Sequence, residues 1–496
     1  MEGRPPRWRA QAVVALAALS IAVAVTGDEP APAQSSPSPG CVGDTEADDV
    51  AQRPGPLLRY GITPGVQAGQ VGGVPAEAVP DQPPRTLAAL DRLRPERAPF
   101  VLRLNRFFFE DGEAGIRRFE RLTERYTSRG YPVEYQLRYH PSEEQEGDIG
   151  EWVRFVRRVV RTFGPNPKVK AIQVTNEVNL TISEDSSDGA FEGARAALVR
   201  GVIAAKETAV ERGYDQLEIG FNWFYRTDPA NEQSFWEYLR DRGGERFVDA
   251  VDWIGLDAYP GTFFPPAEAP GDERDGMVNA MSALRCYAAI PGIPERVPMH
   301  VEENGWPTGP GRTPEMQARV AETLVRAVHD FRGTYNVSDY RWFNLRDADS
   351  SDPRFTQQYG LIRSDYAKKP AFRVYCDLVG RLATDRGETC AASSSASPGD
   401  GGDDGGGPGG GPSGEPGPGE HDGGEEGGGD APATGRGADG ATADTATRVA
   451  APGAAAGSAG EGSLPLTGLL VGALALAGAV LAAAGAVLRR RASPPT

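Results

Sequence analysis

The chain has 496 residues and a formal net charge of −17, and it contains 63 Gly and 42 Pro. Gly and acidic residues are concentrated in residues 391–463, which hold 24 Gly and 12 Asp or Glu but only 2 Arg. A chain of this length would typically contain about three domains. Because that segment has too few large apolar residues to fold, we expect one folded body, over residues 55–390. The acidic balance excludes a nucleic-acid-binding protein, which needs a basic surface to neutralise phosphates.

The N-terminus has the pattern of an export signal. Arg4, Arg7 and Arg9 precede the apolar run Ala12–Val25, and small residues follow that run. The run is short for a membrane-spanning helix, which needs about 20 residues, although an uncleaved anchor is the alternative. We therefore expect residues 1–33 to be a signal peptide, followed by an N-terminal extension over residues 34–54.

The body alternates apolar runs of strand length with patterns of helical period. The eight runs are Leu57–Ile62, Phe100–Leu104, Val133–Leu137, Val169–Val174, Leu217–Phe221, Val251–Leu256, Val297–Val301 and Tyr340–Phe343. One helical face carries Met316, Val320, Leu324 and Val328, and Thr313 is placed to cap its helix. Eight strands alternating with helices predict an α/β fold, a single (β/α)8 TIM barrel over residues 55–390. A doubly wound sheet is the alternative, but no G-x-G-x-x-G follows the first run.

Two glutamates end runs on opposite sides of the predicted barrel. The fourth run leads into Thr175-Asn176-Glu177, and the seventh leads into Glu302-Glu303-Asn304-Gly305-Trp306-Pro307. In a TIM barrel the active site lies at the C-terminal ends of the strands. Glycoside hydrolysis needs two carboxyl groups there, one to protonate the leaving oxygen and one to attack or to activate water. Together the two predict such a site, whereas a single acidic residue at a strand end is usually solvated or salt-bridged.

This pattern resembles the retaining glycoside hydrolases of clan A, the 4/7 superfamily, over about residues 57–380. The stretch from Glu303 to Pro307 is similar to the E-x-G-W-P of the plant-type β-1,3-glucanases. The resemblance implies that Glu177 is the acid/base and Glu303 the nucleophile, with Glu302 as the alternative nucleophile. Since side chains alternate along a strand, only one of the adjacent glutamates is expected to point into the barrel mouth.

The resemblance implies roles for further residues, one position at a time. Arg103, with Arg106 as its rival, would keep the nucleophile ionised, and Tyr259 would donate a hydrogen bond to it. Asn176 would bind the 2-hydroxyl group of the sugar. The remaining expected sugar contacts are Trp342 as the floor of the site, His140 and Trp306. Core packing is the alternative for the aromatic residues, and a capped surface position is the alternative for His140. No metal and no organic cofactor is implied.

Four cysteines without a C-x-x-C pair exclude a zinc ribbon and a thioredoxin-type site. An exported protein can oxidise Cys41, Cys286, Cys376 and Cys390 in three pairings. Pairing Cys41 with Cys390 would join the two ends of the barrel. Cys286 and Cys376 belong to the sixth and eighth predicted helices, and the seventh helix should lie between them. This spacing disfavours a bond between the two, and the connectivity stays open.

The C-terminus resembles the cell-wall sorting signal that sortases recognise. Leu464-Pro465-Leu466-Thr467-Gly468 fits L-P-x-T-G, the apolar stretch 469–488 follows, and three arginines come next. The resemblance implies that a sortase cleaves after Thr467, displaces Gly468 and joins Thr467 to peptidoglycan. A permanent membrane anchor is the alternative. Residues 464–496 would then be the sorting signal, and residues 391–463 a disordered, self-repelling linker through the wall.

The sequence thus predicts a secreted, wall-anchored retaining glycoside hydrolase whose partners are a carbohydrate substrate, a sortase and peptidoglycan. The alternative is a non-catalytic carbohydrate-binding surface protein, or adhesin, on the same barrel. The presence of both carboxylates favours the enzyme, because a binding protein does not need the pair. The sequence does not identify the glycan or its linkage.

Overall fold

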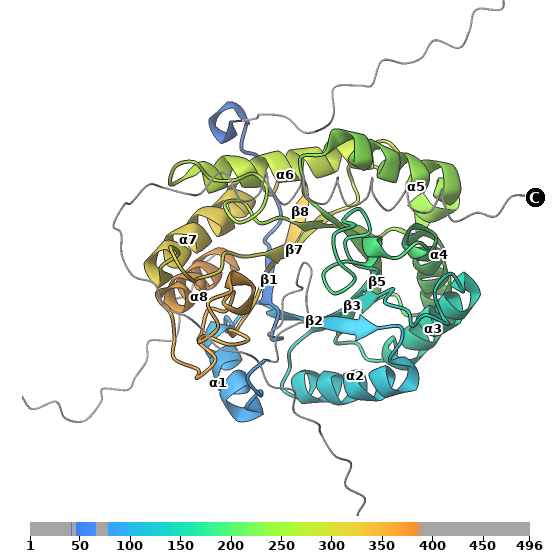
Figure 1. Cartoon of the computed structure of the whole chain (residues 1–496), viewed down its shortest axis with the longest axis horizontal. Helices are drawn as coiled ribbons and strands as arrows, with labels where there is room; N and C mark the ends of the chain where they lie inside the picture. Colours follow the sequence, from blue (N-terminus) through green and yellow to red (C-terminus); the bar gives the residue numbers. More distant parts are fainter. Residues whose placement is uncertain (1–40, 42–45, 66–77, 385–386, 388–496) are drawn as a thin grey trace, which may run out of the picture. The chain divides into compact units, whose positions relative to one another are not determined.

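The computed structural model describes residues 41, 46–65, 78–384 and 387. Eight parallel strands form a closed barrel in sequence order, and helices surround it (Figure 1). The strands are β1 (Arg59–Ile62), β2 (Val101–Phe108), β3 (Val133–Arg138), β4 (Val169–Val174), β5 (Glu218–Phe224), β6 (Trp253–Asp257), β7 (Met299–Asn304) and β8 (Val337–Trp342). The predicted (β/α)8 barrel is confirmed, and each predicted run overlaps one strand.

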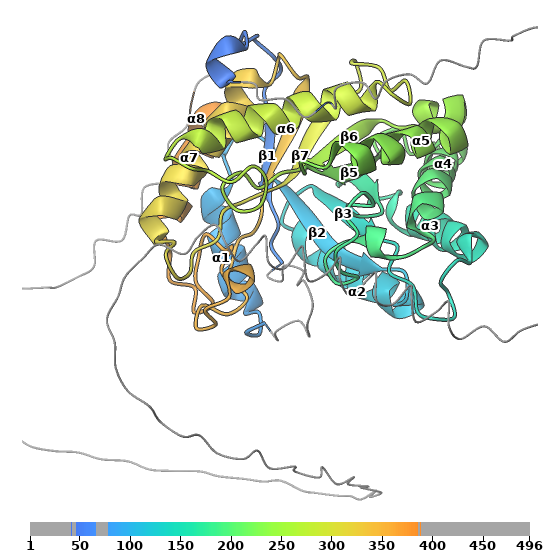
Figure 2. The same ribbon diagram turned by 45° about the horizontal axis from the view of Figure 1, so that its top comes forward.

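Each strand is followed by one helix of the outer ring, which Figure 2 shows obliquely. The helices are α1 (Pro83–Leu93), α2 (Gly112–Thr127), α3 (Ile149–Phe163), α4 (Ala194–Arg212), α5 (Pro229–Ala250), α6 (Asp272–Ala288), α7 (Pro314–Phe331) and α8 (Pro370–Leu382). Thr313 caps α7 as predicted, because its side chain accepts a hydrogen bond from the backbone of Met316. Val320 and Leu324 are buried on the predicted face, but Met316 is exposed.

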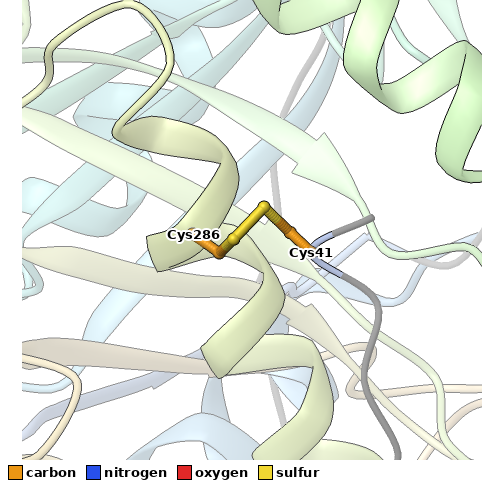
Figure 3. The surroundings of a disulfide bond; sticks show 2 residues. All are labelled: Cys41 and Cys286. Atoms are coloured by element: carbon orange, nitrogen blue, oxygen red, sulfur yellow. A yellow bond between two sulfur atoms is a disulfide. The ribbon is translucent and has the colours of Figure 1, made fainter. Parts of the chain in front are cut away.

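A disulfide bond ties the segment before the barrel to the helical ring. Cys41 is bonded to Cys286 of α6, with 5.5 Å between the Cα atoms (Figure 3). Cys376 of α8 is also disulfide-bonded, and none of the described cysteines is free. The structure therefore gives one pairing that the sequence left open, and it excludes a bond between Cys41 and Cys390.

The predictions for the two ends of the chain lie outside the described residues. They concern the signal peptide, the linker 391–463, the apolar stretch 469–488 and the sorting residues from Leu464 to Gly468. These stay predictions. Within the described ranges, no helix combines the length and apolar character that crossing a bilayer requires.

The interior of the barrel is charged where TIM barrels are usually filled by branched apolar side chains. Arg341 of β8 donates to both carboxylate oxygens of Glu134 at 2.8 Å and to Asp339 at 2.8 Å. The ring of His300 lies between Glu302, at 3.2 Å, and Asp339, at 3.1 Å. These five side chains are all buried. Burying a charge is costly unless it is paired, and here each charge has a partner of opposite sign or a hydrogen bond. This network forms the floor below the barrel mouth.

Candidate active site

The turn after β4 has a backbone conformation that places Glu177 at the mouth. Thr175 and Glu177 have φ values of 68° and 47°, in the left-handed region that a β-branched residue such as threonine rarely adopts. Three long-range hydrogen bonds hold this turn. The backbone N–H groups of Thr175, Asn176 and Glu177 donate to Leu137 O at 2.7 Å, Asp188 Oδ2 at 2.8 Å and Asn222 Oδ1 at 2.8 Å. Strain fixed by surrounding structure in this way is typical of functional sites.

A β-bulge in β7 brings both adjacent glutamates into the barrel. Leu256 of β6 pairs with Val301, but the next residue, Asp257, pairs with Glu303, so Glu302 is the extra residue. Arg103 donates from Nε to Glu302 at 2.9 Å and from Nη1 to Glu303 at 3.0 Å. Strand alternation therefore does not separate the two glutamates as the sequence argument assumed, because a bulge re-aims a side chain, although only one of them reaches the mouth as predicted. Glu302 lies in the charged floor, and only Glu303 lines the cavity described below.

Glu303 is held on both of its carboxylate oxygens. Oε1 accepts from Arg103 at 3.0 Å and from Gln136 Nε2 at 3.0 Å. Oε2 accepts from the hydroxyl group of Tyr259 at 2.7 Å. The predicted neighbours Arg103 and Tyr259 are thus in contact with Glu303, whereas Arg106 pairs with Asp185 at 2.8 Å instead. Gln136 was not predicted as a site residue. The available signal was a polar residue near the C-terminal end of the predicted third strand.

Glu177 and Glu302 lie in different electrostatic environments. Burial, together with the negative charge of Glu303, raises the pKa of Glu177 well above its ordinary value, against the positive charges of Arg138 and Arg103. Burial acts in the same direction on Glu302, but the hydrogen bond with His300 and the charge of Arg103 overcome it and lower its pKa to about 2. Of these two glutamates, Glu177 is therefore the one suited to hold a proton near neutral pH.

A third carboxyl group, Asp257 at the end of β6, belongs to the same cluster. One carboxylate oxygen from each of Glu177, Asp257 and Glu303 lies within 4.8 Å of the other two. Asn222 donates to Asp257 Oδ2, and burial and the charges of Glu303 and Glu177 raise the pKa of Asp257 well above its ordinary value. These three groups are the described residues that could hold a metal ion. Asp257 was not among the predicted site residues. Its position as an acidic residue at the end of a barrel strand could have indicated it.

Glu177 and Glu303 form one end of a cavity of about 340 Å³. Its remaining wall comes from the last residue of β5 and from the loops that follow β4, β6 and β8. Half of its 14 lining residues have hydrocarbon side chains. These are Leu180, Ile182, Phe224, Phe263, Phe264, Phe343 and Phe355. The volume falls at the lower end of the range that is usual for small-molecule sites.

The two tryptophans predicted to contact sugar, Trp342 and Trp306, do not line this cavity. Trp342 is fully buried and packs 6.0 Å from the ring of Tyr375 of α8, because Arg341 is the β8 residue that faces the barrel interior. The neighbouring Phe343 lines the cavity instead. Trp306 is buried beneath the guanidinium group of Arg312.

His140 and Asn176 lie near the mouth without lining the cavity. His140 lies 3.0 Å from a carboxylate oxygen of Glu110. Burial and the charges of Arg138 and Arg106 lower the pKa of His140 to about 4, so it is neutral near pH 7. Asn176 accepts hydrogen bonds from Gln136 at 2.8 Å and from Asn222 at 3.0 Å. In this structure Asn176 therefore joins the side chains around Glu177 and Glu303.

No family model matches the sequence. The chain is 24% identical over 159 residues to a probable glucan endo-1,3-beta-glucosidase of Aspergillus clavatus, a match covering 30% of this chain and 32% of that protein. It is 26% identical over 144 residues to the protein of the same name in Aspergillus niger, covering 28% and 29%. The chain therefore spans about a third of the length of the curated relatives it matches.

Two solved structures give a weak likeness in fold. GH5_18 from Streptomyces cattleya in complex with GlcNAc has a TM-score of 0.43 at 15% identity, covering 61% of this chain and 75% of that one. A structure from a study of two plant beta-glucan endohydrolases has a TM-score of 0.42 at 16% identity, covering 62% and 98%.

Proposed function

We propose that this protein is a retaining glycoside hydrolase in which Glu177 is the acid/base and Glu303 is the nucleophile. The observation that carries the proposal is the position of the two carboxyl groups, which follow β4 and end β7, have oxygens within 4.8 Å of each other and line one cavity. Retaining enzymes have such carboxyl groups about 5–5.5 Å apart, and inverting enzymes about 6.5–9.5 Å. A separation of this size supports direct attack by Glu303 rather than attack by a water molecule held between Glu303 and the sugar.

The surroundings of the two groups support these roles in a two-step reaction. The raised pKa of Glu177 keeps its proton available, and that proton goes to the glycosidic oxygen as the bond to the anomeric carbon breaks. Arg103, Gln136 and Tyr259 orient Glu303, whose carboxylate forms a bond to the same carbon. Glu177 then takes a proton from water, which attacks the carbon and releases Glu303. Two inversions leave the anomeric configuration unchanged.

The partial similarity to glucan endo-1,3-beta-glucosidases supports a β-linked glucan as the first substrate to test. We expect the wild-type protein to hydrolyse such a glycoside and the Glu303→Ala variant to lose that activity while staying folded. Azide should restore part of the turnover of this variant, because a small anion can occupy the space of the lost carboxylate. Proton NMR of the first-formed product should show the starting anomer. An inverted product would contradict the retaining mechanism, and no hydrolysis across a glycan panel would favour the adhesin.

We also propose that the enzyme acts outside the cell while attached to the wall. The proposal depends on the sequence pattern from Leu464 to Gly468, the apolar stretch after it and the export signal. Replacing Thr467 by Ala should remove the protein from detergent-boiled, purified cell wall, since sortase recognition would be lost. Unchanged covalent attachment of the variant would refute the sorting signal.

A further inference from the structure

Seven of the 14 residues that line the cavity at Glu177 and Glu303 have hydrocarbon side chains, and the polar ones besides these two are Ser186, Tyr259, Arg354, Thr356 and Tyr359. Leu180, Phe224, Tyr259, Phe343 and Tyr359 form a hydrophobic cluster separate from the main core. Among the described residues, no tryptophan lines the cavity. A hydroxyl group that is placed against the hydrocarbon part of this lining loses its hydrogen bonds to water without gaining new ones. Each such loss lowers affinity by about one to two orders of magnitude.

Exposed apolar side chains gather on the rim of this cavity. The described residues include six large apolar side chains that are clearly exposed. Three of them line this cavity: Ile182 is 50% exposed, Phe263 37% and Phe355 38%. They come from the loops after β4, β6 and β8, which are far apart in the sequence. Apolar groups that converge in this way mark a binding surface, whereas single exposed ones need no explanation.

The aromatic rings interlock instead of forming one flat platform. The Phe263 ring meets Phe224 at 64°, Tyr259 at 85° and Phe355 at 63°, with ring centroids 5.6–6.0 Å apart. Edge-to-face packing of this kind is favourable for the rings themselves. It leaves a wall of ring edges and faces, with Leu180 and Ile182 as its aliphatic part. An alkyl or aryl group matches that wall better than a chain of hydroxylated sugar rings does.

The apolar wall begins beside the residue that would protonate the leaving group. The backbone N–H group of Leu180 donates to the carbonyl oxygen of Glu177 at 2.8 Å, so Leu180 lies one tight turn after the acid. Ile182 follows on the same loop. The group that departs with the protonated oxygen must lie next to Glu177 and therefore next to these side chains.

From these observations we propose that the substrate is a glycoside with an apolar aglycone, an alkyl or aryl group that lies against Ile182, Phe263 and Phe355 while the sugar occupies the site at Glu177 and Glu303. The proposal depends on the proposed function for the position of the sugar. The aglycone could belong to a glycolipid or to an aryl glycoside, which share this chemistry.

Binding to an inactive variant tests the proposal without requiring turnover. Titration calorimetry on the full-length Glu303→Gln protein would use methyl, phenyl and n-octyl β-glycosides of glucose, mannose, galactose and N-acetylglucosamine, below their critical micelle concentrations. For the sugar that binds best, we expect the octyl or the phenyl glycoside to bind at least 30-fold more tightly than the methyl one. A fully buried methylene contributes about fourfold. A preference for octyl would indicate a lipid-like aglycone, and a preference for phenyl an aromatic one.

Variants of the rim separate cavity binding from general surface adsorption. Ile182→Ser should lower the octyl-to-methyl affinity ratio about tenfold, and Phe355→Ser provides a second test at another loop. The control is Val210→Ser on the outer surface of α4, where the side chain is 67% exposed, and the ratio should not change. A ratio below about threefold for every sugar, or an equal effect of Val210→Ser, would overturn the proposal. If the wild type hydrolyses methyl and octyl glycosides equally, the proposed function stands and this inference fails. If octyl glycosides bind but no glycoside is cleaved, the proposed function fails alone.

Discussion

The charge of Glu303 is one of the two main causes that raise the pKa of Glu177, and removing this charge tests the roles of both residues. Glu303→Gln keeps the shape of the side chain and removes the charge. Two unit charges 4.8 Å apart repel by about 3.5 kcal/mol at an effective dielectric constant of about 20. Because Arg103 pairs with Glu303 at 3.0 Å, part of this repulsion is already compensated. We therefore expect the pKa of Glu177 to fall by at least one unit, which corresponds to about 1.4 kcal/mol.

The measurement is a carboxyl-carbon NMR titration of protein labelled at glutamate, with the Glu177 signal assigned by its loss in Glu177→Gln. Glu302→Gln serves as the control for a general effect of charge removal, since Glu302 is not among the main causes of the shift at Glu177. A pKa of Glu177 that does not change in Glu303→Gln would refute the electrostatic coupling. It would leave burial as the whole explanation for the raised pKa.

Three further substitutions have expected outcomes. Glu302→Gln should lower the free energy of unfolding by about 3–5 kcal/mol in urea denaturation, because it weakens a buried ion-pair network. A change below about 0.5 kcal/mol, as small as one expected at an exposed position, would contradict this. Asp257 has a raised pKa in the folded state, so its contribution to stability is present below its unfolded pKa near 4 and is lost as the pH rises through the folded value. Asp257→Asn should therefore make the melting temperature fall less between pH 4 and pH 9, and an identical pH dependence would refute this. Cys41→Ser should lower the free energy of unfolding by about 2–5 kcal/mol unless a reductant is already present.

The fold could be predicted from the sequence because its signals are local. Buried strands in a parallel barrel appear as short apolar runs, and the helices between them show a periodic apolar face. α3 is a clear case, with Trp152, Val156 and Val159 buried on one side and Asp148 capping its N-terminus. The ends of strands were less accurate. β2 continues past the predicted end through Asn105 and Arg106 to Phe108, and these two polar residues bond to Glu303 and Asp185.

The two glutamates at the C-terminal ends of β4 and β7 were also predictable, since the fold fixes where such residues meet. What could not be predicted is the bulge at Glu302. No residue of β7 marks it, and it depends on how β6 and β7 pair. The error for Trp342 has the same origin, because assigning its direction requires the register of β8 against its neighbours. Asp257 was missed because its proximity to Glu177 follows from the closure of the barrel, which a linear pattern does not show.

The charged floor and the apolar wall together determine how the acid would respond to its substrate. Burial is the main cause of the raised pKa of Glu177, and an apolar aglycone would expel the water that remains near this carboxyl group. The bound substrate should therefore raise the pKa further, and a longer alkyl chain should do so more than a methyl group. The basic limb of kcat, which reports the complex, should lie at higher pH for an octyl than for a methyl glycoside, while the limb of kcat/KM, which reports the free enzyme, should not move. Equal kcat profiles for the two substrates would show that the aglycone does not reach the wall beside Glu177.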